Sequence, residues 1–130
     1  MANELFGGEI IKKKIKGYLK NLKDQEVEFI DEFSIYNKNK LTYVKDNIKH
    51  NIIIRDKEII LIRESNEFKN ILTFSKNRSI LTEYIIKENN ISIYIEIKTI
   101  ELIIKQNEIY VKYIILDSDT EYEYKIVMEE

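Results

Sequence analysis

The nine residues from Ile91 to Thr99 alternate apolar with polar side chains, reading Ile-Ser-Ile-Tyr-Ile-Glu-Ile-Lys-Thr. Because successive side chains of a β-strand point to opposite faces, a period of two predicts a strand with one buried and one solvated face. Segments of the same kind make up most of the 130-residue chain. The stretch therefore predicts an all-β protein, but it does not indicate an activity.

Strands are predicted over ten segments with short connections: 9–22, 26–36, 40–46, 49–55, 58–64, 68–75, 80–88, 90–104, 107–117 and 120–129. Short connections favour antiparallel neighbours, because a parallel crossover needs roughly a dozen residues or more. No stretch carries the apolar stripe of an amphipathic helix. The expected fold is a single antiparallel barrel of about eight to ten strands.

The long alternating segment also predicts a bend. Ile91, Ile93, Ile95 and Ile97 share one face, whereas beyond Thr99 the apolar residues move to the opposite parity. A bulge or sharp bend changes parity in this way, and barrels use such bends at their corners. We expect the four isoleucines to point inward and to fill the barrel.

Charge predicts how the barrel closes. The first strand is basic, through Lys12, Lys13, Lys14 and Lys16, while the last strand carries acidic residues such as Glu121 and Glu123. Opposite charges on neighbouring strands stabilise their pairing modestly, so the two strands are predicted to be neighbours. The alternative is that the lysines only protect an open edge against aggregation.

Composition bounds the remaining possibilities. The length suits one domain over 1–130, with 1–8 as a flexible tail. A net charge of −2 gives no overall attraction to nucleic acid or to acidic membranes, and no apolar run approaches the ~20 residues of a membrane helix. The N-terminus lacks the pattern of a signal peptide, so a cytoplasmic location is expected.

The turns must form with little help from glycine. The chain has no proline, and its three glycines are Gly7, Gly8 and Gly17. Asparagine and aspartate also adopt left-handed turn conformations. Turns are therefore expected at four pairs: Asn39-Lys40, Asp56-Lys57, Asn89-Asn90 and Asn107-Glu108.

Several short motifs resemble those of the YwiB-like bacterial proteins. They are Tyr43-Val44-Lys45-Asp46, Ile59-Ile60-Leu61-Ile62-Arg63, Leu72-Thr73-Phe74, Thr82-Glu83-Tyr84, Ile93 to Thr99, and Tyr113. The resemblance covers most of the chain from Ile10 onward. Two departures are Glu64-Ser65, where the family usually has a glycine after the arginine, and Asn89-Asn90, where it favours glycine. The resemblance implies a calycin-like or lipocalin-like barrel and no established activity.

Two charged residues on apolar parity form the centre of a candidate site. Asp31 lies between Phe29 and Phe33, and Arg63 follows Ile59 and Leu61. A buried arginine cannot lose its charge and needs acceptors. Arg63 could pair with Asp31 or Asp46 at a barrel mouth that receives an anion, or it could lie at a strand end with its head in water. The candidate ligand-binding residues are Arg63, Asp31, Tyr43, Asp46, Tyr84 and Tyr113.

Two functional hypotheses follow from the expected interior. Its predicted lining is bulky: Phe29, Phe33, Ile93, Ile95, Ile109, Val111 and Tyr113. A filled barrel favours a protein-interaction or assembly module, which exposed aromatics such as Tyr94 and Tyr110 would serve. The alternative is a protein that binds a small apolar or anionic ligand at the barrel mouth or interior. Self-association into a homo-oligomer is compatible with either hypothesis.

Enzymatic motifs are absent from this sequence, and the signature of nucleic-acid binding is weak. His50 is the one histidine, no cysteine is present, and no glycine follows Gly17, so we expect no enzymatic activity and no cofactor. His50 is expected to be a solvated hairpin residue. Tyrosines could stack on single-stranded nucleic acid, but acidic residues next to them would repel phosphate, so no nucleic-acid partner is expected.

Overall fold

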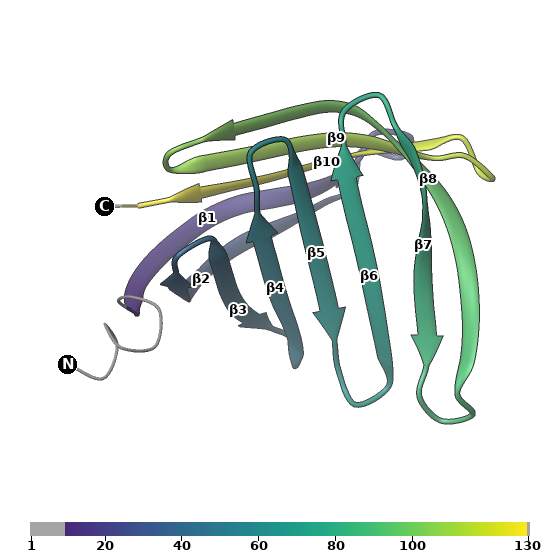
Figure 1. The fold of residues 1–130 in the computed structure, drawn as a ribbon, viewed down its shortest axis with the longest axis horizontal. Helices are drawn as coiled ribbons and strands as arrows, with labels where there is room; N and C mark the ends of the chain where they lie inside the picture. The colour runs from purple at the N-terminus through teal and green to yellow at the C-terminus, as the bar shows by residue number, and fades with distance from the viewer. Residues whose placement is uncertain (1–9, 130) are drawn as a thin grey trace.

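A computed structural model describes residues 10–129 of this chain as ten β-strands (Figure 1). Their bounds are β1 Ile11–Asn21, β2 Val27–Asn37, β3 Lys40–Lys45, β4 Ile48–Ile54, β5 Glu58–Glu64, β6 Phe68–Ser75, β7 Ser79–Ile86, β8 Ile91–Lys105, β9 Glu108–Ile115 and β10 Thr120–Met128. All ten predicted strands are present, and the described residues include no helix. The predicted tail at 1–8 lies outside the described residues.

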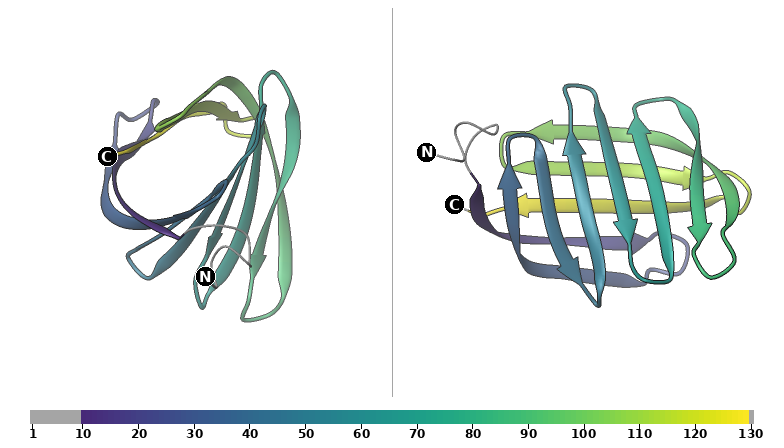
Figure 2. Two further views of the ribbon diagram at one scale, coloured as in Figure 1. Left: turned by 60° about the vertical axis from the view of Figure 1, so that its left-hand side comes forward. Right: turned by 60° about the horizontal axis from the view of Figure 1, so that its bottom comes forward.

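The strands form one closed antiparallel barrel, as predicted. Each strand pairs with its neighbours in sequence, and β1 pairs with β10 to close the sheet. Figure 2 shows β3 to β6 running across β1, β9 and β10 at a steep angle.

The predicted closure between the first and last strands is confirmed. Ile15 lies opposite Met128, and Lys20 lies opposite Glu123. The Nζ atom of Lys16 lies 3.4 Å from a carboxylate oxygen of Glu129. Complementary charge therefore accompanies the pairing, although exposed ion pairs contribute little stability on their own.

Gly17 is required at this closure by close approach of two backbones. A Cβ atom at this position would lie 1.8 Å from the carbonyl oxygen of Lys125, on the neighbouring strand β10. No side chain fits at that distance, so β1 and β10 can approach this closely only with glycine there.

The core is formed by side chains from all parts of the barrel wall. It includes Ile15, Ile30, Leu41, Ile52, Ile59, Phe74, Ile97, Ile109, Val111 and Ile126. The predicted interior residues Ile109, Val111 and Tyr113 are indeed buried, with Ile95 packed against them. On the last strand, Tyr124, Ile126 and Met128 are also buried.

The prediction that Phe29 and Phe33 line the interior is wrong. The two side chains are 73% and 61% exposed, while Ile30 and Ser34, on the opposite parity of β2, are buried. The Oγ of Ser34 donates a hydrogen bond to the carbonyl of Lys13 at 2.9 Å, so a small polar residue is accommodated inside. The phenylalanines lie on the outer surface instead, opposite residues of β1.

Strand β8 bends where the parity changes. Its pairing with β9 shifts register between Thr99 and Glu101, which confirms the predicted bulge. The expectation that four isoleucines fill the barrel is only partly correct. Ile97 is buried, but Ile91 and Ile93 are 48% and 44% exposed, because the end of the β7–β8 hairpin extends past the closed core (Figure 1).

The left-handed turn positions differ from most of those predicted. Asn90 has a φ of 55°, as expected for its pair, but Lys38 rather than Asn39 adopts φ 58° in the β2–β3 turn. Asp46 and Asn47 are both left-handed, with φ values of 52° and 64°. The pattern of the sequence locates the turns, whereas the register of each hairpin decides which residue takes the strained position.

Candidate functional site

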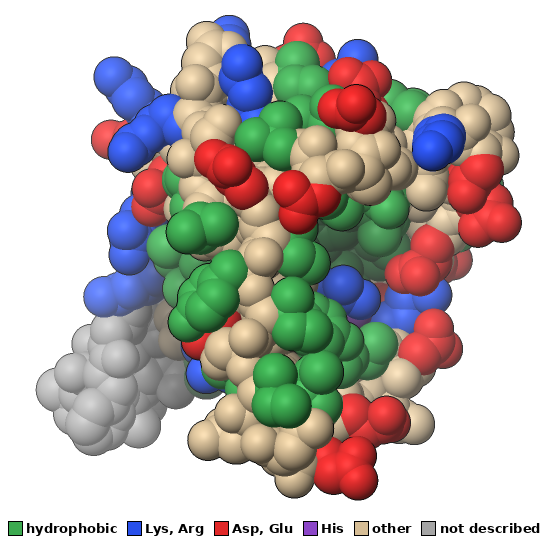
Figure 3. All heavy atoms as spheres, turned by 90° about the vertical axis from the view of Figure 1, so that its right-hand side faces the viewer, with side chains coloured by type: hydrophobic (Ala, Val, Ile, Leu, Met, Phe, Trp, Pro, Cys, Tyr) green, Lys and Arg blue, Asp and Glu red, His purple; other side chains and the backbone are tan. Residues whose placement is uncertain are grey.

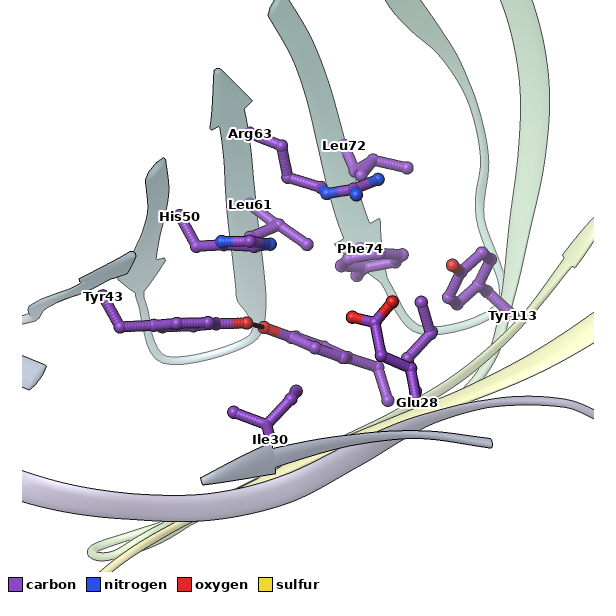
Figure 4. Close-up of a pocket in the computed structure, with 11 residues that line it drawn as sticks. Glu28, Ile30, Tyr43, His50, Leu61, Arg63, Leu72, Phe74 and Tyr113 are labelled. Carbon is purple, nitrogen blue, oxygen red and sulfur yellow. Dashed lines mark hydrogen bonds between the residues drawn. The ribbon is translucent and has the colours of Figure 1, made fainter. Parts of the chain in front are cut away.

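A small cavity lies inside one end of the barrel (Figure 4). Its volume is about 30 Å³, which is room for about one or two water molecules. It is lined by Leu19, Glu28, Ile30, Tyr43, His50, Leu61, Arg63, Leu72, Phe74, Tyr113 and Tyr124. Small-molecule pockets have volumes of roughly 300 Å³ or more, so this cavity cannot enclose a whole ligand of that kind.

Two tyrosines from distant strands meet at the bottom of the cavity. The hydroxyl groups of Tyr43, on β3, and Tyr124, on β10, lie 2.8 Å apart in a buried hydrogen bond (Figure 4). Burial raises the pKa of Tyr43 to about 12 and raises the pKa of Tyr124 well above its ordinary value, so both remain neutral at physiological pH. This contact ties the two sides of the barrel together.

His50 is buried rather than solvated, contrary to the prediction. Its ring is 6% exposed and stacks on Tyr43 with centroids 4.4 Å apart. Its Nδ1–H donates a hydrogen bond to the carbonyl of Ile48 at 3.1 Å. Burial, with a further contribution from the positive charge of Arg63, lowers the pKa of His50 to about 4, so the ring is neutral at physiological pH.

Three neighbouring strands place a polar row at this end of the barrel. His50 on β4 pairs with Arg63 on β5, which pairs with Asn70 on β6. Asn70 is buried and donates through Nδ2 to the carbonyl of Glu83 at 3.0 Å. Arg63 is half-buried, and its guanidinium carbon lies 5.8 Å from the ring centre of Phe68.

Arg63 has no carboxylate partner among residues 10–129. Neither predicted acid pairs with it: Asp31 lies on the outer surface with a carboxylate oxygen 2.7 Å from the Nζ of Lys14, and Asp46 lies 3.2 Å from Lys45. The acid that lines the cavity is Glu28, whose carboxylate is 3.6 Å from the Nζ of Lys45. The alternative in which Arg63 pairs with Asp31 or Asp46 is therefore wrong.

The structure brings three of the six predicted site residues together. Tyr43, Arg63 and Tyr113 line the cavity, whereas Asp31 and Asp46 do not. Tyr84 does not line the cavity; it lies on β7, where its ring stacks on that of Phe68 on β6 with ring centres 5.2 Å apart.

Sequence reasoning missed His50, Glu28 and Tyr124 as cavity residues. For Tyr124 a signal existed, because the alternation of the last strand places it on the inner face. Glu28 lies two residues from Ile30, but its charge argues against an inward position.

A second notable surface lies outside the barrel. We call it the β1–β2 face and define it by Lys12, Lys14, Lys16, Phe29, Phe33 and Ile35. The Nζ atoms of Lys12 and Lys14 lie 4.5 and 4.7 Å from the ring centre of Phe33. Ile35 is 52% exposed. The face therefore combines exposed apolar groups with three lysines, and cation–π contacts hold two of these lysines beside the aromatic ring.

The β1–β2 face borders a free strand edge. Strand β2 pairs with β3 only through Ile35, Tyr36 and Asn37. Asn21 of β1 donates its backbone N–H to the carbonyl of Glu26 at 2.9 Å. Because backbone hydrogen bonds alternate along an antiparallel pair, the even-numbered residues of β2 bond to β1 through their backbones, whereas the backbone groups of the odd-numbered residues point away from β1. The backbone groups of Phe29, Asp31 and Phe33 thus face the side from which β3 has diverged.

Other functional groups are sparse in the part of the chain that the structure covers. Within residues 10–129, no three His, Asp or Glu side chains are arranged to hold a metal ion. Among the same residues, no helix has the length and apolar character needed to cross a membrane.

Comparison with known proteins gives a likeness at the level of the fold. The sequence matches no protein-family model and no curated protein. The structure is similar to the crystal structure of the ywiB protein from Bacillus subtilis, with a TM-score of 0.63, 16% sequence identity, and coverage of 91% of this chain and 89% of that chain. The resemblance predicted from the sequence motifs is therefore confirmed for the fold, and the two chains share one β-barrel architecture.

Proposed function

We propose that this barrel is a protein-interaction module that docks a partner on the β1–β2 face. The observation that carries the proposal is the exposure of two phenylalanines on that face, Phe29 at 73% and Phe33 at 61%. Contiguous apolar groups on a soluble surface commonly mark an interaction site. The small interior cavity adds support, because it leaves little room for the alternative of an enclosed ligand.

Charge defines the kind of partner. The phenylalanines lie beside Lys12, Lys14 and Lys16; Asp31 pairs with Lys14 and Glu129 pairs with Lys16, so the net charge of these five side chains is positive. An acidic surface with apolar groups would complement this face. A second copy placed face to face would bring lysines against lysines, so a different, acidic protein is the favoured occupant.

The free edge of β2 suggests how the partner is held. Backbone groups of Phe29, Asp31 and Phe33 point to the side without a paired strand. An extended segment can add to such an edge through main-chain hydrogen bonds, with alternate side chains giving specificity. An acidic extended segment would bind the edge and contact the phenylalanines together.

The proposal has further parts that concern the protein as a whole. We propose a calycin-like, non-enzymatic barrel of bacterial origin that acts in the cytoplasm without a nucleic-acid partner. Support comes from the sequence, which combines a net charge of −2 with a single histidine and no cysteine. Retention of the full chain on heparin at low salt would contradict the exclusion of nucleic acid.

Site-specific photo-cross-linking in cells tests the docking surface. A photoreactive phenylalanine analogue replaces Phe29 in one variant and Leu81 in the control. Leu81 is 65% exposed on β7, so the two positions are comparably accessible. We expect a discrete cross-linked product from position 29 only, mapped to an acidic segment of the other protein. Reversing Lys12, Lys14 and Lys16 to glutamate should remove it.

Three results would count against this docking surface. They are equal products from both positions, a product that survives the charge reversal, and a product whose contact segment is basic or comes from a second copy of this chain.

A further inference from the structure

We propose that the mouth of the barrel binds small carboxylates that carry an apolar body, with Arg63 as the residue that receives the carboxylate. This site is separate from the β1–β2 face, and the inference does not depend on a protein partner. It rests on three features of the mouth: an arginine without an ion pair, a small cavity beside it, and an exposed apolar lip.

The charge of Arg63 is available to a ligand. Its guanidinium group takes part in no ion pair or side-chain hydrogen bond among the described residues, although the side chain is only half-exposed. In Figure 4 it extends from β5 over Phe74. Arginine presents a planar array of donors that matches the two oxygens of a carboxylate, which favours this group over a point-charge ligand.

The nearby groups are compatible with an anion. His50 donates through Nδ1 to its own strand, and the neutral hydroxyls of Tyr43 and Tyr124 bond to each other, which leaves one of their two O–H groups free to donate. Tyr113 has no hydrogen-bond partner among the described residues and is 9% exposed. The competing carboxylate is that of Glu28, and Lys45 at 3.6 Å offsets its charge. Lys45 also pairs with Asp46 at 3.2 Å, so the four charges of Arg63, Lys45, Glu28 and Asp46 balance, and Arg63 is the one of the four without an ion pair among residues 10–129.

Cavity size limits what enters. A volume of about 30 Å³ accepts a head group of a few atoms, so the rest of a ligand must stay outside. A flat, two-oxygen carboxylate suits this space better than a bulkier tetrahedral anion.

The lip outside the cavity can hold an apolar body. An open groove of about 430 Å³ beside the cavity is lined by Phe68, Tyr84 and Ile86 on its apolar side and by Asn66, Glu67, Lys87 and Glu88 on its polar side. Ile93 pairs with Tyr84 on the same inner face and is 44% exposed. Figure 3, which views the molecule from its β7–β8 side, shows hydrophobic side chains gathered around a hollow, with basic and acidic side chains beside them. Phe68 contacts both Arg63 and Tyr84, so the head-group site and the lip are continuous.

Titration followed by NMR tests the inference directly, because His50 is the one histidine of the chain and its ring lies in the site. Octanoate is the probe, with acetate lacking the apolar body and 1-octanol lacking the charge. At neutral pH we expect octanoate to shift the His50 ring signals saturably. Acetate and 1-octanol should each bind at least about tenfold more weakly, since each loses one of the two contacts.

Two arginine variants separate this site from general charge effects. Arg63→Met should weaken octanoate binding about tenfold or more, because one charge-assisted hydrogen bond has about that effect. Arg55→Met removes an exposed arginine that pairs with Glu58 and should leave binding within about twofold. Arg63→Gln serves as a second variant if Arg63→Met does not unfold cooperatively.

Several results would overturn the inference. Equal binding of 1-octanol and octanoate would contradict the role of the charge, and equal binding of acetate and octanoate would contradict the apolar lip. Unchanged octanoate affinity in both Arg63 variants would remove Arg63 from the site. The ligand series uses the unmodified protein, so it decides the first two points whatever the stability of the variants.

Discussion

His50 illustrates how strongly one buried residue can link this fold to pH. In the folded barrel its pKa is about 4, whereas in an unfolded chain it is close to the ordinary value of 6.5. Between these two values the unfolded chain binds a proton that the folded chain does not. The contribution of His50 therefore favours folding least at low pH, and stability falls as the pH drops from 6.5 towards 4.

The variant His50→Phe should remove this part of the pH dependence while keeping an aromatic ring against Tyr43. Between pH 7 and pH 4.5, we expect the free energy of unfolding of the native chain to fall by about 2–3 kcal/mol more than that of the variant. Urea unfolding at both pH values measures the difference. Carboxylates titrate in both proteins alike, so an identical pH dependence would show that His50 is not buried in a neutral form.

At the scale of elements, the closure of β1 on β10 is the most constrained contact of the barrel. A methyl group at Gly17 would collide with the backbone of Lys125, which cannot move without separating the two strands. Overpacking of this kind commonly costs about 1–3 kcal/mol, and here the obstacle is backbone rather than a flexible side chain. The closure therefore depends on the absence of a side chain, a property that no hydrophobic pattern indicates.

Gly17→Ala is expected to lower the free energy of unfolding by about 3 kcal/mol or more. Lys16→Ala is the matched control on the same strand, because Lys16 is exposed and its substitution should change stability by less than about 1 kcal/mol. Denaturant unfolding compares the two. If Gly17→Ala is as stable as the control, the β1 and β10 backbones are not as close as described.

For the elements, much of the fold was predictable because the relevant signals are local. Alternation located all ten strands, the parity change located the bulge after Thr99, and opposite charges located the closing pair. The identity of the left-handed residues was less predictable, since Lys38 takes a position that intrinsic preference would give to Asn39. Hairpin register, which depends on both strands, overrides the preference of single residues there.

Strand β2 shows where pattern reasoning fails. Its apolar residues at 29 and 33 were assigned to the core because they share a parity, yet the parity of Ile30 and Ser34 faces inward. A strand with large apolar groups on one side and charged groups on the other is normally read with the apolar side buried. Here the ammonium groups of Lys12 and Lys14 lie over the ring of Phe33, which faces outward, and these contacts stabilise the aromatic side chain at the surface.

The candidate site was predictable only in part for a related reason. Arg63, Tyr43 and Tyr113 could be grouped because each lies on the inner parity of its strand. The proposed acid partners were wrong, since the outward direction of Asp31 follows from the same inversion of β2. His50 was missed because its neighbour Lys49 is charged and its burial comes from tertiary stacking on Tyr43.

At the scale of the whole molecule, the barrel wall carries large apolar side chains on its outer surface, because β2 exposes Phe29 and Phe33 and buries Ile30 and Ser34. The cavity beside Arg63 has a volume of only about 30 Å³, and exposed aromatic groups lie on the outer wall. With this arrangement, binding sites are expected on the outer surface and at the mouth of the barrel rather than in an enclosed pocket. Both proposals above depend on this placement of side chains.

Fluorine NMR with fluorinated phenylalanine tests that placement most directly, with signals assigned by single Phe→Leu variants. In the presence of a soluble paramagnetic agent, the signals of Phe29 and Phe33 should broaden strongly, because both rings are more than half exposed. The signal of Phe74, which is 1% exposed, should stay sharp. Protection of Phe29 and Phe33 to the same degree as Phe74 in the isolated protein would contradict the account.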